Sequence, residues 1–137
     1  MNYEGACHCG AISHVYSTEL PVSSWSLRAC QCAFCRAHGA TSASDPGGTL
    51  VFGFAEPEEV NRYRFARKTA DFLICRRCGI YIRAIIATVN GAYGIANLNA
   101  LLQTLDGLGE PEAACYDAES FAGRVRRRED RWTPVVL

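Results

Sequence analysis

The sequence has few features of a secreted, membrane-spanning or nucleic-acid-binding protein. Lys+Arg and Asp+Glu are balanced at 14 residues each, so no overall charge would attract a polyanion. The N-terminal segment MNYEGACHCG lacks the basic and apolar regions of a secretory signal. The longest apolar run, residues 80–89, is interrupted by Arg83 and is too short to span a bilayer. We therefore expect a cytoplasmic protein with no membrane partner, for which nucleic acid is not the expected ligand.

Helical patterns are also scarce. Runs rich in β-branched and aromatic residues predict strands at residues 11–16, 22–28, 49–54, 60–65, 71–74, 80–89 and 92–98. Asn90-Gly91 predicts a type I′ hairpin turn between the last two strands. Short helices are indicated only at residues 99–105 and 117–128, the second with Asp117 as its cap. The 137 residues predict one domain, residues 1–137, that is mainly β with antiparallel sheets and one or two short helices.

Cysteine, in contrast, is abundant, with eight residues in the chain. In a reducing compartment, so many cysteines favour metal binding or chemistry over disulfides. Seven of them fall in three tight groups, Cys7-x-Cys9, Cys30-x-Cys32-x-x-Cys35 and Cys75-x-x-Cys78, while Cys115 stands alone.

The two cysteine pairs each supply half of a tetrahedral zinc site. Cys75 and Cys78 have the spacing of a zinc knuckle, in which Gly79 provides the permissive backbone for the turn. Cys7 and Cys9 face the same side of an extended segment. Together the pairs predict one structural Cys₄ zinc that joins segments some seventy residues apart. A thioredoxin-like redox pair is the alternative for Cys75 and Cys78, but the sequence shows no βαβ unit for it.

The group Cys30, Cys32 and Cys35 is left with three thiolates. One interpretation is a second closed site whose fourth ligand is His38 or Cys115. The other is a catalytic zinc with three protein ligands and one exchangeable position. The sequence alone leaves both open.

Three ordered motifs resemble one family. G-x-C-H-C-G (Gly5 to Gly10), C-x-C-x-x-C-R-x-x-G (Cys30 to Gly39) and C-x-x-C-G (Cys75 to Gly79) are similar to the motifs of the glutathione-dependent formaldehyde-activating enzyme (GFA) family, which includes centromere protein V. The resemblance implies a β-tent fold with two zinc ions per chain, one structural and one in the active site. It assigns the structural ligands to the two cysteine pairs and the active-site ligands to the group of three, in agreement with the spacing.

The activity that this resemblance implies is a carbon–sulfur lyase, S-(hydroxymethyl)glutathione synthase, which condenses formaldehyde with glutathione. The expected partners are therefore a small thiol and a small aldehyde. Because three thiolates and a bound substrate thiolate would give the zinc site a net negative charge, nearby cations are needed, and Arg28 and Arg36 are the candidates for this role or for binding a glutathione carboxylate. The alternative function is a non-catalytic zinc module that carries glutathione or recruits a partner. The basic segment 124–131 is expected to be a solvated helix face with local ion pairs to Glu129 and Asp130.

Overall fold

The computed structural model describes residues 1–55, 57–66 and 68–136. Its strands are β1 (Asn2–Ala6), β2 (Ile12–Ser17), β3 (Arg28–Cys30), β4 (Ser42–Ala43), β5 (Thr49–Phe54), β6 (Val60–Tyr63), β7 (Asp71–Cys75), β8 (Tyr81–Thr88), β9 (Gly91–Asn97), β10 (Glu112–Ala114) and β11 (Thr133–Val136). The helices of these residues are α1 (Ala33–His38), α2 (Phe121–Arg131) and the short 3-10 turns Val22–Ser24, Pro57–Glu59 and Leu98–Ala100. The prediction of a mainly β chain with one or two short helices is confirmed. Within the described ranges, no helix is long and apolar enough to cross a membrane.

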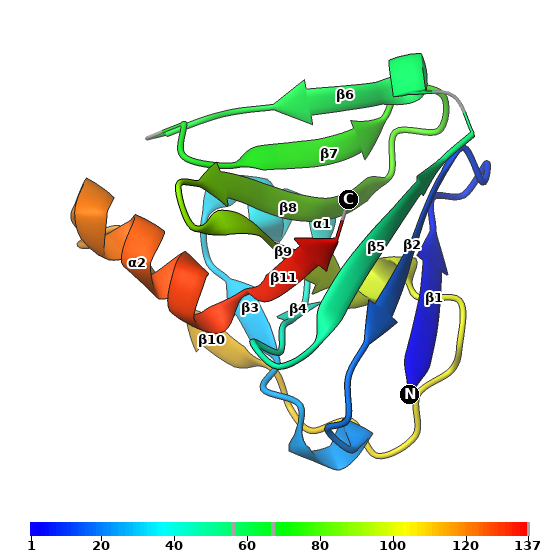
Figure 1. Ribbon diagram of the computed structural model, residues 1–137, viewed down its shortest axis with the longest axis horizontal. Helices are drawn as coiled ribbons and strands as arrows, with labels where there is room; N and C mark the ends of the chain where they lie inside the picture. Colours follow the sequence, from blue (N-terminus) through cyan, green and yellow to red (C-terminus); the bar gives the residue numbers. More distant parts are fainter. Residues whose placement is uncertain (56, 67, 137) are drawn as a thin grey trace.

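The strands form two layers, called slopes below, that lean against each other (Figure 1). β1, β2 and β5 make one slope, and β6, β7, β8 and β9 make the other. β11 connects them, because Thr133 and Pro134 pair with β9 while Val135 and Val136 pair with β5. Most pairings are antiparallel as predicted, but β11 runs parallel to β5 and β10 runs parallel to β3, so the sheet is mixed.

Several predicted elements differ in detail. The segment 22–28 forms a 3-10 turn and only the beginning of β3, and residues 99–105 contribute only part of the turn Leu98–Ala100. The second helix begins after Ser120, whose side chain accepts the capping hydrogen bond from the backbone N–H of Gly123, so the prediction that Asp117 caps it is wrong. The hairpin is confirmed, but its two-residue loop is Val89-Asn90, and neither residue has the positive φ of a type I′ turn.

The space between the slopes contains an unusual polar pair. Arg83 of β8 is fully buried, stacks its guanidinium on the Phe52 ring at 3.4 Å and donates a hydrogen bond to the backbone oxygen of Ser13 on the opposite slope. His14 of β2 is also buried. A Cβ atom at Gly5 would overlap the His14 ring, so the glycine makes room for the imidazole. Burial and the charge of Arg83 lower the pKa of His14 to about 3.

This shift predicts that acid destabilises the fold through His14. The folded-state pKa is depressed below the ordinary value of 6.5, so the stability is fully present above about pH 6.5 and is lost as the pH falls toward about 3. In urea unfolding, wild type should lose about 2 kcal/mol of unfolding free energy relative to His14→Leu when the pH falls from about 7 to about 5. The exposed His8 provides the control, since His8→Gln should leave this pH dependence unchanged. Parallel pH dependences for wild type and His14→Leu would contradict the prediction.

Candidate metal centres

The four-cysteine cluster lies where the two slopes meet. Cys7 follows the end of β1, Cys75 ends β7, and Cys9 and Cys78 lie in the turns that come after them. The two turns share a design: Gly10 and Gly79 adopt positive φ values of 82° and 77°. In each turn the N–H of the first cysteine donates to the carbonyl five residues later, Ile12 or Ile80. The predicted role of Gly79 is confirmed, whereas Cys9 lies in a turn and not on the extended segment that the sequence predicted for Cys7 and Cys9.

The geometry of this cluster fits a tetrahedral metal ion. All four sulfur atoms lie within 4.8 Å of one another. The Sγ–Sγ distances are 3.7 Å for Cys7 and Cys9 and 3.6 Å for Cys9 and Cys75. A zinc–sulfur bond of about 2.3 Å gives a tetrahedron with edges of about 3.8 Å, close to these values. Cys7 and Cys75 pack with Ile12 and Ile82 in the core, so these two ligands cannot move apart without opening the apolar interior.

Hydrogen bonds favour the thiolate form in this cluster. Burial alone would raise the pKa of the Cys78 thiol. The N–H groups of Cys9 and Ile80 donate hydrogen bonds to its sulfur, and this effect outweighs burial, so the pKa of Cys78 is lowered to about 6. The backbone N–H of Ile12 also donates to Cys7 Sγ at 3.4 Å. A thiolate is the form that binds metal, so the turns prepare the ligands.

The three-cysteine cluster is built around the beginning of α1. Cys30 ends β3, Cys32 is the N-cap of α1, and Cys35 is buried in the first turn of the helix. The Cys32 sulfur accepts a hydrogen bond from the backbone N–H of Cys35 at 3.4 Å. All three sulfur atoms lie within 4.8 Å of one another. The short helix, which the sequence patterns did not predict, is thus what brings the third sulfur to the other two.

Contact between the Cys30 and Cys35 thiols shifts their pKa values in opposite directions. The Cys35 thiol donates a hydrogen bond to Cys30 and lowers the pKa of Cys30 to about 5. The same contact, together with burial, raises the pKa of Cys35. Because adjacent thiolates repel one another, a bound cation is what allows all three to ionise, and the donor set fits a soft divalent ion such as zinc.

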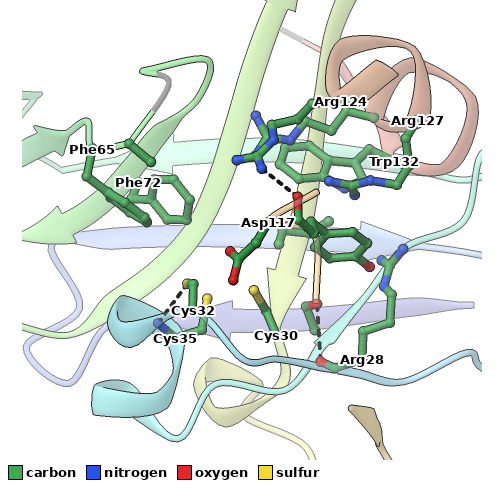
Figure 2. Close-up of a pocket in the computed structure, with 15 residues that line it drawn as sticks. Arg28, Cys30, Cys32, Cys35, Phe65, Phe72, Asp117, Arg124, Arg127 and Trp132 are labelled. Atoms are coloured by element: carbon green, nitrogen blue, oxygen red, sulfur yellow. Dashed lines mark hydrogen bonds between the residues drawn. The ribbon is translucent and has the colours of Figure 1, made fainter. Parts of the chain in front are cut away.

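A pocket of about 240 Å³ opens beside these three sulfur atoms (Figure 2). Phe65, Phe72, Ile95 and Trp132 supply apolar parts of its wall. Among the residues that the structure describes, no fourth His, Cys, Asp or Glu ligand atom lies within 4.8 Å of all three sulfurs. A metal ion at this cluster would therefore have three protein ligands on one side and a pocket on the other.

Positive charge dominates the polar part of the pocket wall, which four arginines line: Arg28, Arg124, Arg127 and Arg128. Arg127 donates to Glu119 at 2.7 and 3.1 Å, and its guanidinium lies 3.6 Å from the centre of the Tyr116 ring. Arg128 is buried, and its Nε has no hydrogen-bond partner among the residues that the structure describes. Burial and the neighbouring arginines lower the pKa of Arg128 to about 10, which still leaves it charged at neutral pH.

The other predicted site residues lie away from the three sulfurs or outside the ligand group. His38 packs against Phe34 and Tyr81, with ring centroids 4.6 and 5.5 Å away, and does not join the cluster. Cys115 is exposed and donates a hydrogen bond to Asp117 at 3.5 Å. Arg28 lines the pocket as expected of a residue that contacts a bound molecule, whereas Arg36 is exposed on α1 and does not line it.

Sequence reasoning missed part of the site. The basic segment of α2 was expected to be a solvated face, yet it delivers three arginines to the pocket, and the ion-pair partner of two of them is Glu119 rather than Glu129 or Asp130. Arg126, on the other side of the helix, is exposed as expected. The spacing Arg124, Arg127 and Arg128, at i, i+3 and i+4, was the available signal that these side chains share one helix face.

Fold and site define a mainly β protein with two cysteine clusters that have the geometry of metal sites. The crystal structure of a Rhodobacter sphaeroides protein, a structural genomics target, is similar to this chain, with a TM-score of 0.61 and 29% sequence identity over 81% of this chain and 99% of that chain. No protein-family model matches the chain, and no curated protein matches it.

The two clusters predict different responses to loss of one ligand. Cys75→Ser should lose metal from the four-cysteine site and unfold, because a structural zinc contributes roughly 10 kcal/mol or more, comparable to the whole stability of a domain. Cys32→Ser should lose one metal ion and stay folded, because serine is itself a good N-cap and keeps the hydrogen bond from the N–H of Cys35. Native mass spectrometry would count the metal ions and circular dichroism would report folding. A wild-type protein with one metal ion, or equal unfolding of both variants, would contradict this division.

Proposed function

We propose that the chain is a zinc-dependent carbon–sulfur lyase of the GFA type, resembling S-(hydroxymethyl)glutathione synthase. Its two slopes would then be those of a β-tent fold, with a structural zinc at Cys7, Cys9, Cys75 and Cys78 and a second zinc at Cys30, Cys32 and Cys35. The observation that carries the proposal is the pocket, which joins a three-sulfur metal centre to a wall of arginines. A purely structural zinc has no need of such a pocket, so the pocket favours a centre that binds a small molecule over a module in which both metal ions are only structural.

The reaction adds a thiol to a small aldehyde. The sulfur lone pair forms the new carbon–sulfur bond, the carbonyl π electrons move to oxygen, and that oxygen takes up a proton to replace the one that the thiol lost. A free thiol has a pKa near about 8.5 and is mostly protonated at neutral pH. A zinc ion at the three cysteines would supply Lewis acidity that favours the thiolate.

The arginines would bind and orient the thiol substrate. Glutathione carries two carboxylates, and a guanidinium fork matches a carboxylate with two parallel hydrogen bonds. Arg128 lines the pocket, so its guanidinium is a candidate donor to a substrate carboxylate. Apolar side chains such as Phe72 and Trp132 limit the access of water, which strengthens these charge interactions.

Arg28 and Arg36 offer a matched test of this role. Arg28 lines the pocket and Arg36 does not, although both were candidates from sequence. Loss of one buried charge-assisted contact costs about 1.5–3 kcal/mol, so Arg28→Gln should lower kcat/KM for glutathione by about tenfold or more, while Arg36→Gln should stay near wild type. Exchange of ¹³C-formaldehyde with its glutathione adduct, followed by NMR, measures the rate.

Metal content separates the possible outcomes of this experiment. If wild-type protein with two bound zinc ions does not accelerate the exchange, the glutathione form of the proposal is wrong. If both arginine variants behave alike while circular dichroism shows them folded, the pocket does not bind the thiol substrate through Arg28.

A further inference from the structure

Asp117 has the most unexpected position in the pocket. It is the acidic side chain in a lining that also holds four arginines, yet no arginine of the described chain lies within 4 Å of its carboxylate. Figure 2 shows the carboxylate turned toward the side of the pocket where the three sulfur atoms gather. The hydrogen bond that the structure assigns to this carboxylate comes from Cys115 Sγ, at 3.5 Å. This exposed carboxylate pairs with no arginine of the described chain and faces three cysteines, so it is available to bind a cation held by them.

The backbone around Asp117 is anchored to the metal centre. β10 runs parallel to β3, with Ala114 opposite Cys30, and the N–H of Gln31 donates to the carbonyl oxygen of Ala114 at 2.9 Å. Asp117 follows three residues after this pair, in a turn that the N–H of Glu119 closes onto the carbonyl of Tyr116. The strand pairing therefore fixes where Asp117 enters the pocket, while its exposed side chain is free to rotate.

We propose that Asp117 is an exchangeable fourth ligand of the metal ion held by Cys30, Cys32 and Cys35, and that an incoming thiol displaces it. This inference rests on the metal centre of the proposed function. In the structure the carboxylate is outside the 4.8 Å group of ligand atoms, so it reaches the metal by side-chain rotation in the open pocket.

Charge and ligand preference both favour such an exchange. Three thiolates on a divalent ion carry a net charge of −1, and either a carboxylate or a substrate thiolate brings it to −2. The negative charge that faces the arginines is therefore the same before and after the substrate binds. An oxygen ligand is harder than sulfur and is the weaker partner for a thiolate-rich zinc, so a thiol can replace it. The Asp117 carboxylate, when bound in the fourth position of the metal ion, would also limit the binding of water there.

The test uses ¹¹³Cd NMR of the full chain loaded with ¹¹³Cd²⁺, which reports each metal site separately. We expect two resonances, from the four-cysteine and three-cysteine sites. Asp117→Asn should move the three-cysteine resonance and leave the other in place, which also shows that the variant is folded. Asp117→Glu, which keeps a carboxylate, should restore a signal near that of wild type. Asp106→Asn, at an exposed aspartate outside the pocket, should change neither.

Metal affinity and thiol binding provide the second readout. Asp117→Asn should weaken zinc binding at the three-cysteine site by about tenfold or more, measured by chelator competition. The same variant should lower the concentration of 2-mercaptoethanol needed to shift the three-cysteine ¹¹³Cd resonance, because no carboxylate competes. If Asp117 had only a structural role, Asp117→Asn would weaken zinc binding and thiol binding together.

The outcomes separate this inference from the proposed function. Two resonances that Asp117→Asn leaves unmoved would overturn the role of Asp117 and leave the metal centre standing. A three-cysteine resonance that moves in Cys115→Ala and not in Asp117→Asn would assign the fourth position to Cys115 instead. A single ¹¹³Cd resonance in the wild-type protein would overturn the metal centre, and with it both proposals.

Discussion

The meeting of four cysteines at the junction of the two slopes is the constraint on which the rest of the structure depends. The chain is long enough to build a core, but its slopes enclose a buried arginine and histidine as well as apolar side chains. Arg83 has no carboxylate partner among the described residues, and stacking on Phe52 offsets the free-energy cost of burying its charge only in part. A metal ion at Cys7, Cys9, Cys75 and Cys78 would supply the binding energy that keeps the slopes closed at one end, while β11 joins them at the other.

The metal clusters were the most predictable part of the chain, because ligand spacing is a local property with a geometric meaning. Cys-x-x-Cys followed by glycine specifies a turn that gathers two sulfurs, and the structure places Cys75, Cys78 and Gly79 in that turn. Strands with strong β-branched patterns were also predictable: residues 49–54 coincide with β5, and 71–74 lie within β7. In both cases the information lies within a few neighbouring residues.

The pocket wall could not be predicted, since it depends on contacts between distant segments. Arg28 and Arg127 are separated by almost a hundred residues and line the same cavity only because α2 folds back over the sheet through Trp132. The basic run of α2 has the same sequence pattern whether its arginines face solvent or a pocket. Similarly, Asp117 looked like a helix cap, and only the parallel pairing of β10 with β3 shows that it enters the pocket.

The two clusters offer the same kind of ligand in different surroundings, and the surroundings fit the different roles that we propose for them. At the four-cysteine site, backbone N–H groups and apolar side chains surround the sulfurs, so the thiolates are held by the fold itself. At the three-cysteine site the neighbours on one side are arginines, whose charge faces the pocket. A centre that exchanges one anion for another, as we propose for this one, needs positive charge within reach in both states. The arginine wall is therefore as much a part of the metal centre as the cysteines are.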